Sequence, residues 1–245
     1  MPAETTSVWP AAVEMLNAGG RSPFVLTCEH ASRHIPTDYQ GLGLPEAEIS
    51  RHIGWDIGAA AVTRRLSALL DAPAFLSNYS RLLIDLNRPL GAESSIPILS
   101  EITVIPGNQD LDAAERALRA DRMFHPFHTA VTAHLDERAR CGRPALILAI
   151  HSFTPVFKGV ERPWHAGVLF SHSRDWGAAM VERLGEDGLN IAANQPYVID
   201  RTEDYTIPIH GQDRGLPALL IEIRQDLIGE AAGAEEWAER LARAV

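Results

Sequence analysis

Short apolar runs alternate with helical patterns along this chain, and this alternation is the feature that most restricts its fold. The apolar runs are strand-length and bounded by Pro, Gly or polar residues; they are 23–28 (PFVLTC), 145–150 (ALILAI), 166–170 (AGVLF) and 217–223 (PALLIEI). The helical patterns cover 54–70, 111–140, 174–186 and 233–244. Continuous apolar runs are typical of strands buried on both faces of a parallel sheet. The pattern predicts an α/β fold with three layers, α/β/α, around a mainly parallel central sheet.

The chain is long enough for one substantial core. Its 245 residues are 46% hydrophobic, which favours a single domain over 1–245. Two irregular stretches, 89–110 and 195–215, interrupt the alternation, and neither has the composition of an interdomain linker. We expect the first to be a long loop and the second to be a segment that covers a substrate.

Charge and cysteine content narrow the possible partners and location. The net charge of −10 argues against nucleic acid or an anionic membrane surface as a partner, because both would be repelled. The N-terminus lacks the pattern of a secretory signal, and no apolar stretch reaches the length of a membrane span. Only two cysteines occur, without metal-finger spacing. We expect a cytoplasmic protein without membrane attachment, and the sequence leaves its oligomeric state open.

Polar residues follow three of the apolar runs directly. Glu29 and His30 follow the first run, His151 follows the second, and Glu222 lies near the end of the last. Ligands of open α/β sheets bind beyond the carboxyl ends of the strands. We therefore expect these four side chains to converge at one edge of the sheet.

Two imidazoles and a carboxylate are the usual protein ligands of a catalytic zinc ion. We predict His30, Asp56 and His151 as the metal ligands. Asp56 lies at the start of the first long helical pattern, on the same face as His52 if the helix extends that far back. Glu29 and His52 are expected either to hydrogen-bond to these ligands or to replace one of them.

Glu222 remains free to act as a general base beside the metal. A carboxylate in this position can take a proton from water and deliver it to a leaving amine. No short zinc motif such as HExxH occurs. A divalent metal is predicted, with Zn²⁺ favoured and Co²⁺ or Mn²⁺ as alternatives, because His and carboxylate ligands suit all three.

Several arginines near the expected site favour a small anionic substrate, since the guanidinium group binds carboxylates well. We predict that Arg81, Arg88 and Arg224 bind the substrate, together with His210 in the second irregular stretch. For Arg81 and Arg88 the alternative is a salt bridge to Asp85 or to a helix end. For His210 the alternative is stabilisation of its own loop.

The blocks that carry these residues resemble those of the N-formylglutamate amidohydrolase family and occur in order over most of the chain. They read CEHASRHIP, HIGWDIGA, SRLLIDLNRP, AIHSFTP and DRTEDYTIPIHGQDRGLPALLIEIRQDLI. The order His, acidic residue, His and late Glu is also similar to that of zinc-dependent cell-wall amidases and carboxypeptidases of a related α/β/α fold.

The resemblance implies a metal-dependent hydrolysis of N-formyl-L-glutamate to formate and L-glutamate, a late step in some routes of histidine degradation. It places His30, Asp56 and His151 in the blocks of the metal ligands and Glu222 in the block of the general base. Two alternatives stay open. One is a metal amidase or carboxypeptidase that acts on another acyl-amino acid or a peptide, and the other is a non-catalytic protein that binds a small acid. A base beside the metal argues against a protein that only binds.

Overall fold

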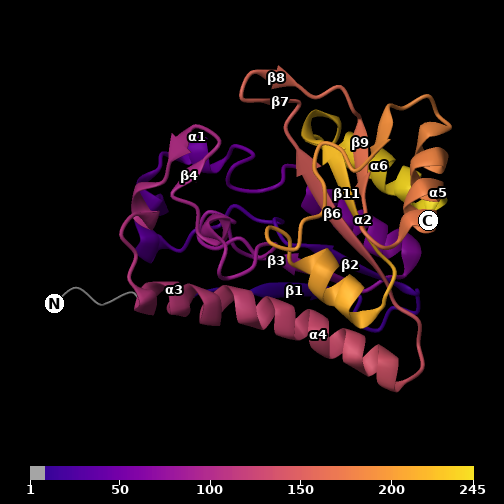
Figure 1. The fold of residues 1–245 in the computed structure, drawn as a ribbon, viewed down its shortest axis with the longest axis horizontal. Coiled ribbons are helices and arrows are strands. Elements are labelled where there is room, and N and C mark those ends of the chain that lie inside the picture. Colours follow the sequence, from indigo (N-terminus) through magenta and orange to yellow (C-terminus); the bar gives the residue numbers. More distant parts are fainter. Residues whose placement is uncertain (1–8) are drawn as a thin grey trace.

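A computed structural model describes residues 9–245 and shows that the protein is built around a central sheet (Figure 1). Within these residues, the seven strands of the sheet follow the order β1-β3-β2-β6-β11-β9-β10. Their bounds are β1 Val13–Leu16, β2 Phe24–Cys28, β3 Ala74–Ser77, β6 Leu146–Phe153, β9 Ala166–Leu169, β10 Ile191–Ala193 and β11 Ala218–Arg224. The pairings of β1 with β3 and of β9 with β11 are antiparallel, and the other pairings are parallel. The mainly parallel sheet is thus confirmed.

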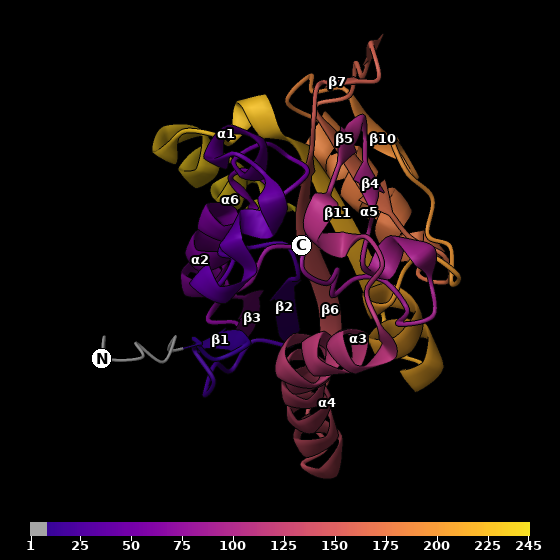
Figure 2. The ribbon, with the colours of Figure 1, turned by 90° about the vertical axis from the view of Figure 1, so that its left-hand side faces the viewer.

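Helices cover both faces of the sheet. One face packs against α2 (Ala59–Leu70), α5 (Arg174–Gly185) and α6 (Ala231–Ala244). The other face packs against α4 (His125–Arg140), which continues from α3 (Ala113–Arg119) through a π-helical turn. Figure 2 shows α2 and α6 together on one side of β2, β6 and β11. The α/β fold with helices on both sides is as predicted.

Apolar periodicity explains how the helices attach to the sheet. Val62 and Leu66 of α2 and Trp237 and Leu241 of α6 are four residues apart and buried on a shared face. Removing each such side chain from water contributes about 1.5–3 kcal/mol, which is enough to fix a helix on the sheet. α2 and α6 also pack against each other.

The strands that carry the expected site are buried in the middle of the sheet. β6 lies between β2 and β11, and the register pairs His151 with Glu222. β9 runs in the opposite direction to β11, so its first residue, Ala166, pairs with Ile223 near the carboxyl end of β11. The connection from β6 to β9 therefore begins and ends at the edge of the sheet where the polar residues lie.

The irregular stretches contain short elements that the sequence did not predict. The first stretch contains a hairpin of β4 (Leu99–Ser100) and β5 (Thr103–Val104), and the connection from β6 to β9 contains a hairpin of β7 (Val156–Phe157) and β8 (Val160–Glu161). The second stretch contains a π-helical segment at Thr206–Gly211. A further short helix, α1, covers Glu46–Ile49. None of the helices in residues 9–245 combines the length and apolar character that crossing a membrane requires.

Candidate metal centre

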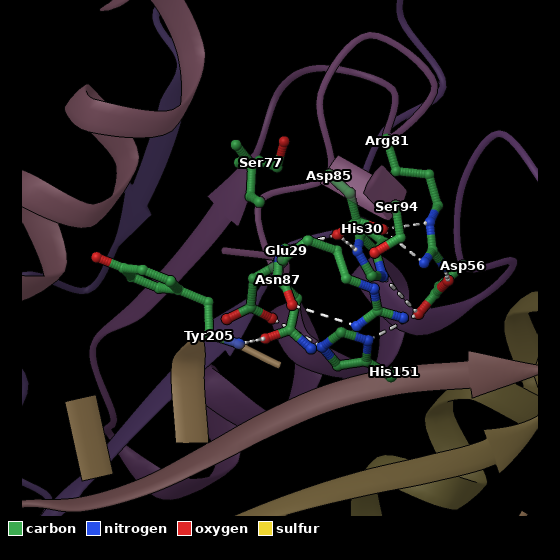
Figure 3. A network of polar contacts seen from close by, with 12 residues as sticks. Glu29, His30, Asp56, Ser77, Arg81, Asp85, Asn87, Ser94, His151 and Tyr205 are labelled. Atoms are coloured by element: carbon green, nitrogen blue, oxygen red, sulfur yellow. Dashed lines mark hydrogen bonds and ion pairs between the residues drawn. The ribbon is translucent and has the colours of Figure 1, made fainter. Parts of the chain in front are cut away.

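Three predicted ligands come together from three distant segments. His30 follows β2, Asp56 lies in the turn before α2, and His151 belongs to β6; all three are buried, and their ligand atoms lie within 4.8 Å of one another. Asp56 Oδ2 is 3.3 Å from His30 Nδ1 and 3.0 Å from His151 Nδ1. Figure 3 shows both rings directed at the Asp56 carboxylate. The Nδ1 atoms therefore face the centre of the cluster.

The outer nitrogen of each ring is held by a second carboxylate. His30 Nε2 lies 2.7 Å from Asp85 Oδ1, and His151 Nε2 lies 2.8 Å from Glu29 Oε2. With a proton on Nε2 donated outward, Nδ1 of each ring would offer its lone pair to a cation at the centre of the cluster, in place of the contact with Asp56. Carboxylate–histidine pairs of this kind orient metal-binding imidazoles and increase their basicity.

The outer carboxylates are themselves fixed by donors. Thr206 Oγ1 donates to Glu29 Oε1 over 2.6 Å, and the Asn87 backbone N–H donates to Asp85 Oδ1 over 2.9 Å. Burial raises the pKa of Glu29, but the hydrogen bond and charge of His151 and the hydrogen bond from Thr206 together outweigh burial and hold this pKa at about 2. Glu29 is thus an ionised partner of His151, one of the predicted ligands.

The cluster fits a divalent cation on its donor chemistry. Burial opposes ionisation of Asp56, yet the adjacent His30 and His151 lower the pKa of its carboxyl. The Ser152 backbone N–H also donates to Asp56 Oδ2, over 3.2 Å. Two inward imidazole nitrogens and one ionised carboxylate match the protein ligands of a catalytic site in which other positions remain open. The donor set alone does not select among the metals that such ligands accept.

Glu222 lies beside this cluster on the neighbouring strand. It is opposite His151 in the register of β6 and β11, it is buried, and its Oε2 has no hydrogen-bond partner within residues 9–245. Burial raises the pKa of Glu222 to about 8, and the charge of Asp56 adds to this effect. A carboxylate without a structural partner, with a perturbed pKa and next to possible metal ligands, suits proton transfer.

These groups open into one cavity of about 540 Å³, which is in the size range of ligand sites. The metal cluster and Glu222 form part of its wall, together with Arg81 and Arg88. Leu99, Phe157, Tyr197 and Val198 add an apolar and aromatic part to the same wall. The cavity thus combines polar, reactive groups with apolar surface.

The predicted substrate-binding arginines are placed differently from one another. Arg81 Nε and Nη2 both contact Asp85 Oδ2, at 3.0 and 2.6 Å, and Nη1 lies 3.3 Å from Asp56 Oδ1. Arg88 Nη1 donates to the Glu203 carbonyl over 2.6 Å and to Asp204 Oδ1 over 3.2 Å. Both arginines line the cavity. Arg81 forms the salt bridge to Asp85 given as its alternative, whereas Arg88 pairs with Asp204, a partner that was not predicted.

Three other predicted site residues lie away from the metal cluster. Arg224 does not line the cavity, and its Nε binds Asp226 over 2.8 Å. His210 does not line it either, and its Nε2 lies 2.9 Å from His128 Nδ1. His52 lies in the cavity wall, with Nε2 3.4 Å from Glu101.

The helix expected over 54–70 begins only at Ala59, because Gly58 has the positive φ of 83°. His52 and Asp56 therefore do not share a helix face, and His52 does not join the ligand cluster. Of the two residues expected to support the ligands, the structure places Glu29 in that position.

Asp85, Arg162 and Tyr197 belong to this region but were not predicted as site residues. A signal existed for Asp85, since a carboxylate inside the apolar run RLLIDL must find a partner when buried. Arg162 and Tyr197 lie in irregular segments, and no local pattern marks them.

Comparison with known proteins identifies the family of the chain. The profile of the N-formylglutamate amidohydrolase family matches residues 22–229. The crystal structure of the gene product Atu2144 from Agrobacterium tumefaciens is similar over 96% of this chain and 93% of that chain, with 38% identity and a TM-score of 0.93. N-formylglutamate amidohydrolase from Ralstonia eutropha JMP134 shares the fold over 96% of each chain, with 19% identity and a TM-score of 0.70. No curated protein matches the chain. The match over most of its length shows that the chain belongs to the N-formylglutamate amidohydrolase family.

Proposed function

We propose that this protein is a metal-dependent amidohydrolase that converts N-formyl-L-glutamate and water to formate and L-glutamate. Membership of the family supports an amide as the substrate. The observation that carries the proposal is the position of Glu222, which is buried, has no hydrogen-bond partner for Oε2 within the described residues 9–245, and shares a cavity with His30, Asp56 and His151. We propose these three residues as the ligands of a divalent metal, with Zn²⁺ favoured and Co²⁺ or Mn²⁺ as alternatives.

A divalent cation in such a site increases the acidity of water and polarises an amide carbonyl. The protein's own groups would then move the proton. Glu222, whose ionised form an adjacent cation would favour, accepts a proton from the attacking water and delivers it to the nitrogen of the departing glutamate, so that the amine leaves in a stable form. Asp85 and Glu29 keep the rings of His30 and His151 in the orientation that this reaction needs.

A specific observation favours a second candidate, hydrolysis of amides with larger acyl groups. The cavity of about 540 Å³ is large for N-formylglutamate, and Leu99, Phe157 and Val198 add apolar surface to its wall. An amidase for a bulkier N-acyl amino acid or a peptide would use this surface. The same ligands and the same base would serve that reaction.

A substrate screen with a matched variant tests both candidates. Purified protein is incubated with Zn²⁺, Co²⁺, Mn²⁺ or no metal and with N-formyl, N-acetyl and N-succinyl amino acids. We expect metal-dependent formate release from N-formyl-L-glutamate. Glu222→Gln should lower kcat by about 10²- to 10⁴-fold while the bound metal stays unchanged.

The isosteric exchange Glu182→Gln, at an exposed position of α5, is the control and should retain full activity. Release of acetate or succinate but not formate would favour the second candidate. The proposal fails if no amide is cleaved with any metal, or if Glu222→Gln is as active as the unchanged protein.

A further inference from the structure

The wall of the cavity is strongly acidic, although the proposed substrate is an anion. Its carboxylates are Asp56, Asp85, Glu101, Asp200, Glu203, Asp204 and Glu222. The two arginines in the wall are already paired with carboxylates, since Arg81 binds two aspartates and Arg88 binds Asp204, so their charge is not available to an anionic ligand. A dianion such as N-formylglutamate therefore needs a further cation at the site.

Arg162, directly after β8, supplies a cation of this kind. Its guanidinium lies 4.5 Å from the ring centre of Phe157, 4.9 Å from that of Tyr197 and 5.9 Å from that of Phe153. Its Nη1 donates to the Tyr197 hydroxyl over 2.9 Å. Among residues 9–245 no carboxylate forms an ion pair with it, in contrast to Arg81 and Arg88. Arg162 does not itself form part of the cavity wall, but it contacts Phe157 and Tyr197, which do, so it lies directly beside the cavity.

The backbone ties Arg162 to the strand that carries His151. The Arg162 N–H donates to the Pro155 carbonyl over 2.8 Å, two residues beyond the end of β6. The neighbouring turn is fixed as well, because the Lys158 N–H donates to Glu101 Oε1 over 3.3 Å. These hydrogen bonds hold the main chain that carries Arg162, and the contacts with Phe157 and Tyr197 hold its guanidinium, as a specific binding site requires.

We propose that Arg162 and the Tyr197 hydroxyl form the subsite that binds a carboxylate of the N-acyl acidic amino acid, an assignment that rests on the proposed function. Aromatic rings hold the planar guanidinium in place, so that little conformational freedom is lost when it binds a carboxylate with its remaining N–H groups. The Tyr197 oxygen accepts from Arg162, which leaves its own proton to donate to the same carboxylate. Burial raises the pKa of Tyr197, which keeps this proton in place at neutral pH.

The test measures binding without turnover, in a Glu222→Gln background. N-formyl-L-glutamate is titrated into this protein by calorimetry, with and without Zn²⁺, and again after Arg162→Met, which keeps the apolar stem of the side chain but removes the charge. We expect the Kd to rise by about 10- to 100-fold in Arg162→Met, as for loss of a charge-assisted hydrogen bond pair. Arg162→Lys should restore part of the affinity, and Arg116→Met, at an exposed position of α3, should change nothing.

Two further ligands separate a binding role from a structural one. N-formyl-L-glutamine lacks the side-chain carboxylate, and N-formyl-L-isoglutamine lacks the α-carboxylate. With one of the two, the effect of Arg162→Met should disappear, which identifies the carboxylate that Arg162 binds. An equal loss for all three ligands, or no loss for N-formyl-L-glutamate, would overturn the assignment. Arg162-dependent binding without formate release from the unchanged protein would keep the subsite and reject the proposed reaction.

Discussion

Asp85 and Glu29 are expected to set how well the imidazoles of His30 and His151 hold the proposed metal. Asp85→Asn and Glu29→Gln keep the shape of each side chain but weaken the hydrogen bonds to His30 Nε2 and His151 Nε2. Loss of such partners typically lowers metal affinity by about 10- to 100-fold. We expect this decrease in Zn²⁺ affinity for both variants, measured by competition with a chromogenic chelator.

Asp200→Asn is the matched control, because Asp200 lines the cavity but bonds to Thr202 rather than to a ligand. Equal Zn²⁺ affinity in all three variants would show that the outer carboxylates do not support a metal site.

The buried pair His128 and His210 predicts a pH dependence of stability. His128 Nε2 faces the Leu86 carbonyl, which can only accept, so His128 Nδ1 accepts from His210 Nε2 and both rings are neutral. Burial lowers the pKa of His128 to about 4 and that of His210 to about 3. In the unfolded chain a histidine has a pKa of about 6.5, so below that pH the unfolded chain binds protons that the folded protein does not. The two neutral rings therefore contribute their full stability above that pH, and this contribution is lost as the pH falls.

For His128 alone, the free energy of unfolding should fall by about 2 kcal/mol between neutral pH and about pH 5. Urea unfolding at several pH values measures this decrease. His128→Gln should show a smaller decrease than the unchanged protein. His125→Gln, at an exposed position of the same helix, should show the same decrease as the unchanged protein. Identical pH profiles for all three proteins would contradict the assignment.

Residue placement was predictable where a polar side chain follows an apolar run. That pattern identified Glu29, His30, His151 and Glu222, and the structure brings them to one edge of the sheet. The partners of the arginines were not predictable to the same degree. Whether Arg88 contacts substrate or Asp204 depends on residues more than a hundred positions apart, a relation that only the folded chain establishes.

At the scale of elements, the start of α2 depends on one glycine. Gly58 has a φ of 83°, and a Cβ atom there would lie 2.2 Å from the backbone carbonyl oxygen of Ile228. Gly58→Ala therefore combines an unfavourable backbone conformation with an overlap against main chain, which side-chain motion cannot relieve. It should destabilise the protein by at least about 2 kcal/mol and weaken Zn²⁺ binding through Asp56.

Gly142→Ala separates the two causes, since Gly142 has a φ of 64° but open space where its Cβ would lie. Gly142→Ala should lower the free energy of unfolding, measured with urea, by only about 1 kcal/mol and should leave Zn²⁺ binding unchanged. Equal losses of stability in both variants would contradict the role given to the Ile228 contact.

The long elements were predicted well and the short ones were not. The apolar runs became β2, β6, β9 and β11 within a few residues, because burial in the sheet demands a continuous apolar segment. β4, β5, β7 and β8 have two residues each, too few to show any period. The reversed direction of β9 also left no mark in the sequence, since a buried strand has the same composition in either direction.

For the molecule as a whole, a metal ion would join segments that are distant in the chain. His30, Asp56 and His151 come from β2, the turn before α2, and β6, so a cation bound to all three stabilises only the folded state. We expect Zn²⁺ at a hundred times its Kd to raise the free energy of unfolding by about 2.7 kcal/mol, seen as a higher Tm. Removal with a chelator should reverse this shift without loss of helical circular dichroism, because the apolar core on both faces of the sheet remains. A Tm that does not respond to Zn²⁺ would contradict the metal site.

The reversed strand β9 also makes the twelve-residue connection from β6 an independent unit. This connection, 154–165, leaves and re-enters the sheet at the same edge, next to the cavity. Its length can therefore change without shifting the register of either strand, much as antibody loops vary on a constant framework. We therefore expect that exchange of the loop 154–165 by directed evolution can alter substrate choice while the proposed ligands and the proposed base stay in place.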